Sequence, residues 1–77
     1  MKEFHIAIRS FADARAFVTM AALQPFRVLV GNDAQTVDAK GFIGMASLDC
    51  SKPLKVMCDG DTEGVMAFRE QAGRFLV

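Results

Sequence analysis

The chain has 77 residues, the size of one small domain close to the lower limit at which a single hydrophobic core suffices. Hydrophobic residues make up 52% of the sequence and charged residues 23%, which predicts a folded globule rather than a disordered chain. Nine basic and nine acidic residues give a formal net charge of zero, so we expect no nucleic-acid partner and no attraction to an acidic membrane.

The sequence also carries no mark of a secreted or membrane protein. Glu3, His5 and Arg9 interrupt any apolar core of a signal peptide, and no apolar run approaches the roughly 20 residues of a membrane helix. Cys50 and Cys58 do not form a C-x-x-C motif, so neither zinc nor a redox pair is indicated. We therefore expect a cytoplasmic protein without metal or cofactor, with Cys58 in the core and Cys50 in a loop.

Residues 3–8 alternate between inward apolar and outward side chains, which predicts a half-buried strand with Phe4, Ile6 and Ile8 facing inward. From Ser10 the apolar period becomes that of a helix, whose buried face carries Ala14, Phe17, Val18 and Ala21. Ser10 and Asp13 have the spacing of a capping box at its start. Pro25 ends this helix.

The rest of the chain predicts a hairpin, a brief helix, a strand and a final helix. The hairpin has an inward face of Phe26, Val28 and Val30, a turn at residues 31–33 and a returning strand at 34–39. A brief helix is expected within residues 40–48, and a strand at 54–59 with Leu54, Val56 and Cys58 on one face. Asp61 or Thr62 caps the last helix, whose apolar face carries Val65, Phe68, Ala72, Phe75 and Leu76.

The predicted order is therefore βαββαβα, an α+β fold in which four strands have all helices on one face and the other face open. We expect residues 1–77 to form one domain. Its core is expected to be dominated by phenylalanine, each fully buried ring contributing roughly 1.5–3 kcal/mol.

This order, together with the segment VDAKGFIGMASL at residues 37–48, resembles HPr, the histidine-containing phosphocarrier family of the bacterial sugar phosphotransferase system. The family has Ala-Lys-Ser before a short helix with a methionine- and leucine-rich pattern. Residues 16–18 and 60–63 are similar to the family's first and last helices as well. The resemblance covers most of the chain. It implies an HPr-like open-faced β-sandwich with a four-stranded antiparallel sheet, and a protein that is not an enzyme.

The chain departs from the family at its active site, G-L-H-A-R-P-A, where the histidine accepts a phosphoryl group from enzyme I. An alignment without gaps from Phe17 places Ser10 at the histidine, Ala12 at the arginine and Asp13 at the proline. A second alignment sets Asp13 and Arg15 on the His-x-Arg pair, but it requires a gap inside the helix. Neither alignment supplies a histidine for phosphorylation.

The family's regulatory serine, which follows Ala-Lys, corresponds to Gly41, so both phosphorylation sites of the family are predicted to be missing. His5 is expected on the open face of the sheet, where it cannot replace the active-site histidine. Ser10 can serve as a helix cap and has no adjacent base to activate it. Arg9 and Arg15 are candidate contacts for an anion at the helix start.

In the family, the start of the first helix and the short helix form the docking surface for partner proteins. The corresponding candidate surface here is Phe11, Arg15, Phe42, Ile43 and Met45. The resemblance thus favours a regulatory or interaction module that binds proteins, including those of the phosphotransferase system. The alternative is a phosphocarrier with a non-standard acceptor, Ser10 or Asp13.

Two further hypotheses arise outside the first helix. Residues 59–70 fit the calcium-binding pattern D-x-D-x-E-G-x5-E through Asp59, Asp61, Glu63, Gly64 and Glu70. No entering helix precedes them, and residues from Val65 onward have a helical period, so calcium is the weaker interpretation. On the open sheet face, Ala7, Leu29 and Met57 predict a modest apolar patch that would support weak self-association.

Overall fold

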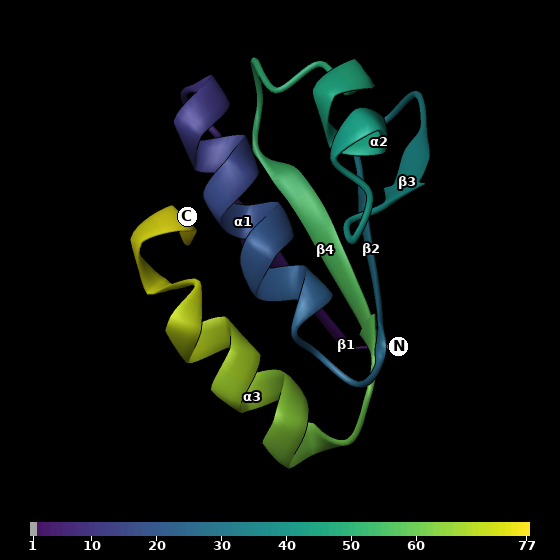
Figure 1. Ribbon diagram of the computed structural model, residues 1–77, viewed down its shortest axis with the longest axis vertical. Coiled ribbons are helices and arrows are strands. Elements are labelled where there is room, and N and C mark those ends of the chain that lie inside the picture. Colours follow the sequence, from purple (N-terminus) through teal and green to yellow (C-terminus); the bar gives the residue numbers. More distant parts are fainter. Residues whose placement is uncertain (1) are drawn as a thin grey trace.

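The computed structural model describes residues 2–77 and contains four strands and three α-helices. In chain order they are β1 (Lys2–Ile6), α1 (Phe11–Ala22), β2 (Arg27–Gly31), β3 (Thr36–Asp38), α2 (Phe42–Ser47), β4 (Leu54–Asp59) and α3 (Thr62–Gln71). The strands form one sheet in the order β1-β4-β2-β3, and each neighbouring pair is antiparallel. Figure 1 shows the helices gathered on one side of this sheet. The predicted open-faced α+β architecture is confirmed.

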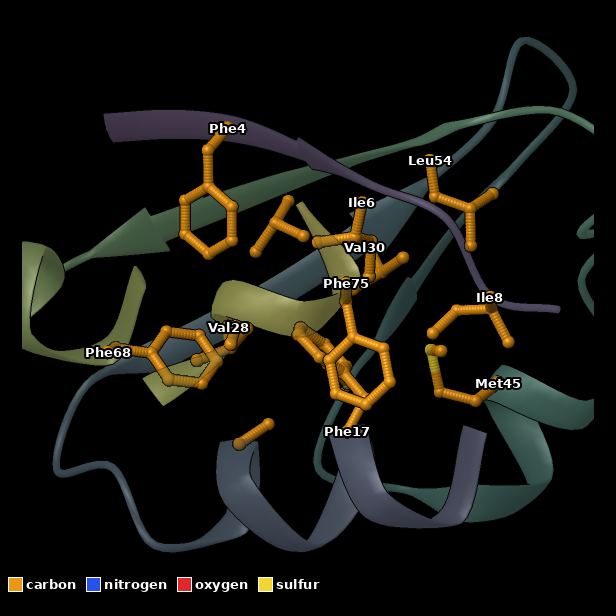
Figure 2. Packing of buried hydrophobic residues seen from close by; sticks show 14 of the residues in the cluster. Phe4, Ile6, Ile8, Phe17, Val28, Val30, Met45, Leu54, Phe68 and Phe75 are labelled. Atoms are coloured by element: carbon orange, nitrogen blue, oxygen red, sulfur yellow. The ribbon is translucent and has the colours of Figure 1, made fainter. Parts of the chain in front are cut away.

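The hydrophobic core lies between the inward face of the sheet and the helices (Figure 2). Phe68 of α3 is at its centre, with ring centroids 5.9 Å from Phe4, 5.7 Å from Phe17 and 6.1 Å from Phe26. Phe17 also meets Phe75 edge to face at 6.1 Å. These contacts join both ends of the chain to α1. The strand alternation of the sequence produces this arrangement, because every second residue of β1, β2 and β4 is buried.

The last predicted helix is shorter than expected. α3 ends at Gln71, and a 3-10 turn, Gly73–Phe75, follows it. Gly73 disfavours continuation of the helix, and Leu76 instead forms a β-bridge with Ile6. Phe75 remains buried as predicted, whereas Leu76 is half-buried beside the sheet and not on a helix face.

Three smaller differences also concern element ends and burial. β1 stops at Ile6 because the Ala7 amide donates to the Phe75 carbonyl at 2.7 Å, although Ile8 beyond it stays buried. β3 spans Thr36–Asp38 only, and Val18 is half-buried rather than buried. No helix within residues 2–77 has both the length and the apolar character needed to cross a membrane.

Candidate functional site

The start of α1 is held by two reciprocal hydrogen bonds between side chains and backbone. Ser10 is extended, and its Oγ accepts from the Asp13 amide at 3.1 Å. Asp13 Oδ2 in turn accepts from the Arg9 amide at 3.0 Å. The predicted Ser10 cap is confirmed, whereas the bond back from Asp13 goes to the amide of Arg9, one residue before the N-cap, and not to that of Ser10 as in a capping box. Because the Asp13 carboxylate already lies at the positive end of the helix, it supplies the negative charge that this end favours.

An open groove of about 420 Å³ lies beside this helix start, between α1, α2 and the segment that leads to β4. Four of its lining residues are buried and apolar, namely Ile8, Ala14, Met45 and Leu48. Arg9, Ser10, Phe11 and Phe42 also line it, so the structure brings these sequence-predicted residues together. Arg15 and Ile43 are not among the lining residues.

Exposed apolar side chains occur at the start of α1 and of α2, the two helices that flank the groove. Phe11 is 66% exposed and packs edge to face on Phe42, with ring centroids 5.0 Å apart. Ile43, the next residue of α2, is 86% exposed. We call Phe11, Phe42 and Ile43 the α1–α2 surface. Met45 was predicted to belong to it and does not, because it is only 1% exposed and packs in the core.

The two arginines at the helix start are exposed and not fixed by ion pairs. Within residues 2–77 no carboxylate oxygen lies within 4.0 Å of the guanidinium of Arg9 or Arg15. The one ion pair among these residues joins Lys55 to Glu3. Arg9 lines the groove, whereas Arg15 lies one turn into α1. Their roles as anion contacts stay predictions.

Cys50 is a residue of the groove that the sequence did not indicate. It is half-buried, and its Sγ lies 3.5 Å from the Leu48 carbonyl, to which the thiol donates. Burial, and secondarily the charge of Asp49, raise the pKa of the Cys50 thiol. The thiol is therefore neutral near pH 7 and a weak nucleophile. Only tertiary packing brings this loop residue to α1, so no local motif could have revealed it.

The position aligned with the family's regulatory serine is the N-cap of α2. Gly41 there has an extended backbone and no side chain to cap the helix. It is exposed, and a Cβ added to it would meet only the Asp38 carbonyl, at 3.8 Å. A serine would fit in this place, so packing does not account for the glycine.

The single histidine lies on the open face of the sheet, as predicted. His5 is exposed and pairs directly with Lys55 of β4. Leu29 and Met57 are also direct cross-strand partners on this face, and both are half-buried. Ala7 lies just beyond β1 and is half-buried too. The His5–Lys55 pair lies between Ala7 and these two residues, so the apolar patch consists of Leu29 and Met57 without Ala7, and self-association through it stays a prediction.

The calcium pattern at residues 59–70 falls on a strand end and a helix. Asp61 is the N-cap of α3, with Oδ1 accepting from the Gly64 amide at 2.7 Å. Residues from Thr62 onward are helical where the pattern needs a loop. No group of three potential metal ligands gathers anywhere in residues 2–77. The helix start explains these carboxylates without a metal.

Among solved structures, the fold is similar to the crystal structure of HPr-C-His from Thermoanaerobacter tengcongensis. The TM-score is 0.76 and the sequence identity 28%, and the match covers 95% of this chain and 92% of that chain. No protein-family model matches the sequence, and no curated protein matches it. The chain therefore has an HPr-like fold.

Proposed function

We propose that this protein is an HPr-like interaction module that binds partner proteins through the α1–α2 surface and does not carry phosphate on histidine. The observation that carries the proposal is the exposed Phe11 ring, which packs on Phe42 at the groove, together with the exposed Ile43 that follows Phe42 in α2. Exposed aromatic and aliphatic groups around a pocket are typical anchors of protein interfaces. From the likeness to HPr we propose proteins of the bacterial phosphotransferase system as partners, in the cytoplasm.

The chemistry at the start of α1 supports a role without phosphate transfer. Ser10 Oγ and the Asp13 carboxylate are both hydrogen-bonded to backbone amides of the helix start. A serine needs a base to become a nucleophile, and His5, the one histidine, extends from the opposite face of the sheet. Gly41 offers no hydroxyl for regulatory phosphorylation.

Binding to purified enzyme I, measured by calorimetry, tests the interaction. We expect Phe11→Ala and Ile43→Ala each to weaken binding by roughly 30-fold, the ~2 kcal/mol of an interface hot spot. The matched control is Met66→Ala, which removes an equally apolar side chain, 58% exposed on α3. Equal affinities of all three variants and the wild type would show that the α1–α2 surface is not the interface.

Phosphotransfer from enzyme I and labelled phosphoenolpyruvate tests the second part of the proposal. We expect no stoichiometric label on the wild-type protein. Label that disappears in Ser10→Ala or in Asp13→Asn would overturn the proposal and establish a phosphocarrier with that acceptor. A serine phosphate survives hot acid and hydroxylamine, whereas the acyl phosphate of an aspartate is hydrolysed by hot acid and cleaved by hydroxylamine, so the lability of the label separates the two.

A further inference from the structure

The open face of the sheet carries a row of side chains that the α1–α2 surface does not involve. His5 pairs with Lys55, Lys55 with Gly31, and Gly31 with Thr36, so one row crosses all four strands. Directly opposite residues of antiparallel strands share a face. The helices cover the other face (Figure 1), and His5, Lys55 and Thr36 of this row are exposed, whereas Gly31 is buried.

Gly31 shapes the middle of the row. A Cβ on Gly31 would lie 2.7 Å from Thr36 Oγ1 and 3.0 Å from the Gln35 carbonyl. The Thr36 hydroxyl thus occupies the place of a side chain at residue 31. A hollow of about 420 Å³ lies here, and its lining includes His5, Thr36, Lys52 and Lys55. We call it the open-face hollow; its volume suits a small molecule.

Two lysines and one aspartate line the hollow. Two further carboxylates act on the lysines from outside the lining: Glu3 pairs with Lys55, and the pKa of Asp49 is lowered by hydrogen bonds with Ser51 and, to a smaller extent, by the charge of Lys52. Lys52 and Lys55 lie on its walls, and within residues 2–77 no carboxylate oxygen comes within 4.0 Å of Lys52 Nζ. Lys55 Nζ has a weak, exposed pair with Glu3 at 3.9 Å. Asp33 is the one acidic residue of the lining.

Two hydrogen-bonding groups in the hollow are free. Neither the imidazole of His5 nor the hydroxyl of Thr36 has a hydrogen-bond partner among residues 2–77. Both can donate to an acceptor oxygen. Two ammonium groups with two such donors around one hollow match the charge and the oxygens of a phosphate group.

We propose that the open-face hollow binds a small molecule with a dianionic phosphate group. Lys52 and Lys55 supply the charge, and Thr36 and His5 donate hydrogen bonds. The site lies on the opposite side of the sheet from Ser10 and the α1–α2 surface. It therefore stands independently of the proposed interaction function.

An NMR titration of the ¹⁵N-labelled protein tests this site, with inorganic phosphate as ligand and sodium chloride of matched ionic strength as background. We expect saturable amide shifts in residues 31–36 and 52–57, with millimolar affinity. The variant Lys52→Gln/Lys55→Gln should weaken binding at least ~10-fold, because it removes both positive charges that attract the phosphate. The matched control is Arg69→Gln/Arg74→Gln, which removes two charges from α3 and the turn after it and should bind as the wild type does.

Three results would overturn the proposal: shifts no larger than those with chloride, unchanged binding by the lysine variant, or loss of binding in the arginine variant. A parallel titration with methyl phosphate identifies the source of the phosphate. Tighter binding than inorganic phosphate indicates a phosphate monoester, and equal binding indicates phosphate itself. Thermal melts of both double variants check that each is folded.

Discussion

The helices α1 and α3 begin with the same kind of cap, but the phenylalanine beside each start, Phe11 at α1 and Phe26 at α3, lies in a different environment. Ser10 caps α1 through the amide three residues on, and Asp61 caps α3 through the corresponding amide. At α3, the Phe26 ring packs so closely on Gly60 that a Cβ there would lie 2.6 Å from the ring. At α1, Phe11 extends into solvent and contacts Phe42 at the rim of the groove.

This difference shows that the cap and the neighbouring aromatic ring have separate roles at a helix start. The cap determines where each helix begins, and it works equally well in either setting. The aromatic side chain decides whether that end belongs to the core or to a surface. Phe26 stabilises the fold, whereas Phe11 gains little from folding and is free for contact with another molecule.

Removing each ring should give the largest contrast. We expect Phe26→Ala to lower the free energy of unfolding by ~2–3 kcal/mol, because Phe26 packs on Phe68, Gly60 and Gly64. Phe11→Ala should lower it by less than about 1 kcal/mol, because the ring is mostly exposed. Urea denaturation measures both. Equal losses would mean that Phe11 is a structural residue after all.

Adding a methyl group beneath Phe26 should have the next largest effect. Gly60→Ala is expected to cost roughly 1–3 kcal/mol through overpacking, since the Phe26 ring has to move. Gly41→Ala, whose Cβ has no neighbour closer than 3.8 Å, is the matched control and should stay within about 0.5 kcal/mol. In a Phe26→Ala background the cost of Gly60→Ala should largely disappear, and persistence of that cost would point to the backbone instead.

The two caps should be of similar and smaller importance. Ser10→Ala and Asp61→Ala each remove one hydrogen bond to a helix amide and should cost ~1 kcal/mol in thermal unfolding. Asp61→Asn keeps an acceptor oxygen and should retain most of the stability. A much larger loss for Ser10→Ala would show that the reciprocal bond from Arg9 to Asp13 depends on the serine.

The reactivity of the two cysteines should distinguish the surface beside α1 from the core, without a change in stability. A thiol reagent should modify Cys50 beside α1 in the folded protein, and Cys58 in the core only after unfolding. Burial raises the pKa of Cys58 to about 11, and burial with Asp49 raises that of Cys50. Modification of Cys50 should therefore be slow at pH 7 and accelerate as the pH rises. Cys50→Ser is the control, and its folded form should show no labelling.

The sequence predicted the parts of the fold that depend on local pattern. Alternation located β1, β2 and β4, and Ser10 and Asp61 located the helix starts. The end of α3 was missed because Leu76 gains more from pairing with β1 than from extending a helix, and that partner is seventy residues distant in sequence.

The candidate site was predictable to a smaller extent. The sequence placed Ser10, Phe11 and Phe42 near one another only through the resemblance to HPr. It could not decide which apolar residue of α2 is buried, because a helix of six residues is too short to show a period. Met45 was consequently placed on the surface in error, whereas Ile43 was placed there correctly.

The pairing of the last residues with β1 also bears on how the protein behaves at high concentration. The Val77 amide donates to the His5 carbonyl, and Leu76 bridges Ile6, so part of this sheet edge is already occupied. The opposite edge, β3, is three residues long. Little unpaired backbone within residues 2–77 can therefore recruit a strand from another chain, which disfavours aggregation. An affinity tag joined to Val77 would start at the β1 edge and disturb the pairing of Leu76 and Val77 with β1 that protects this edge.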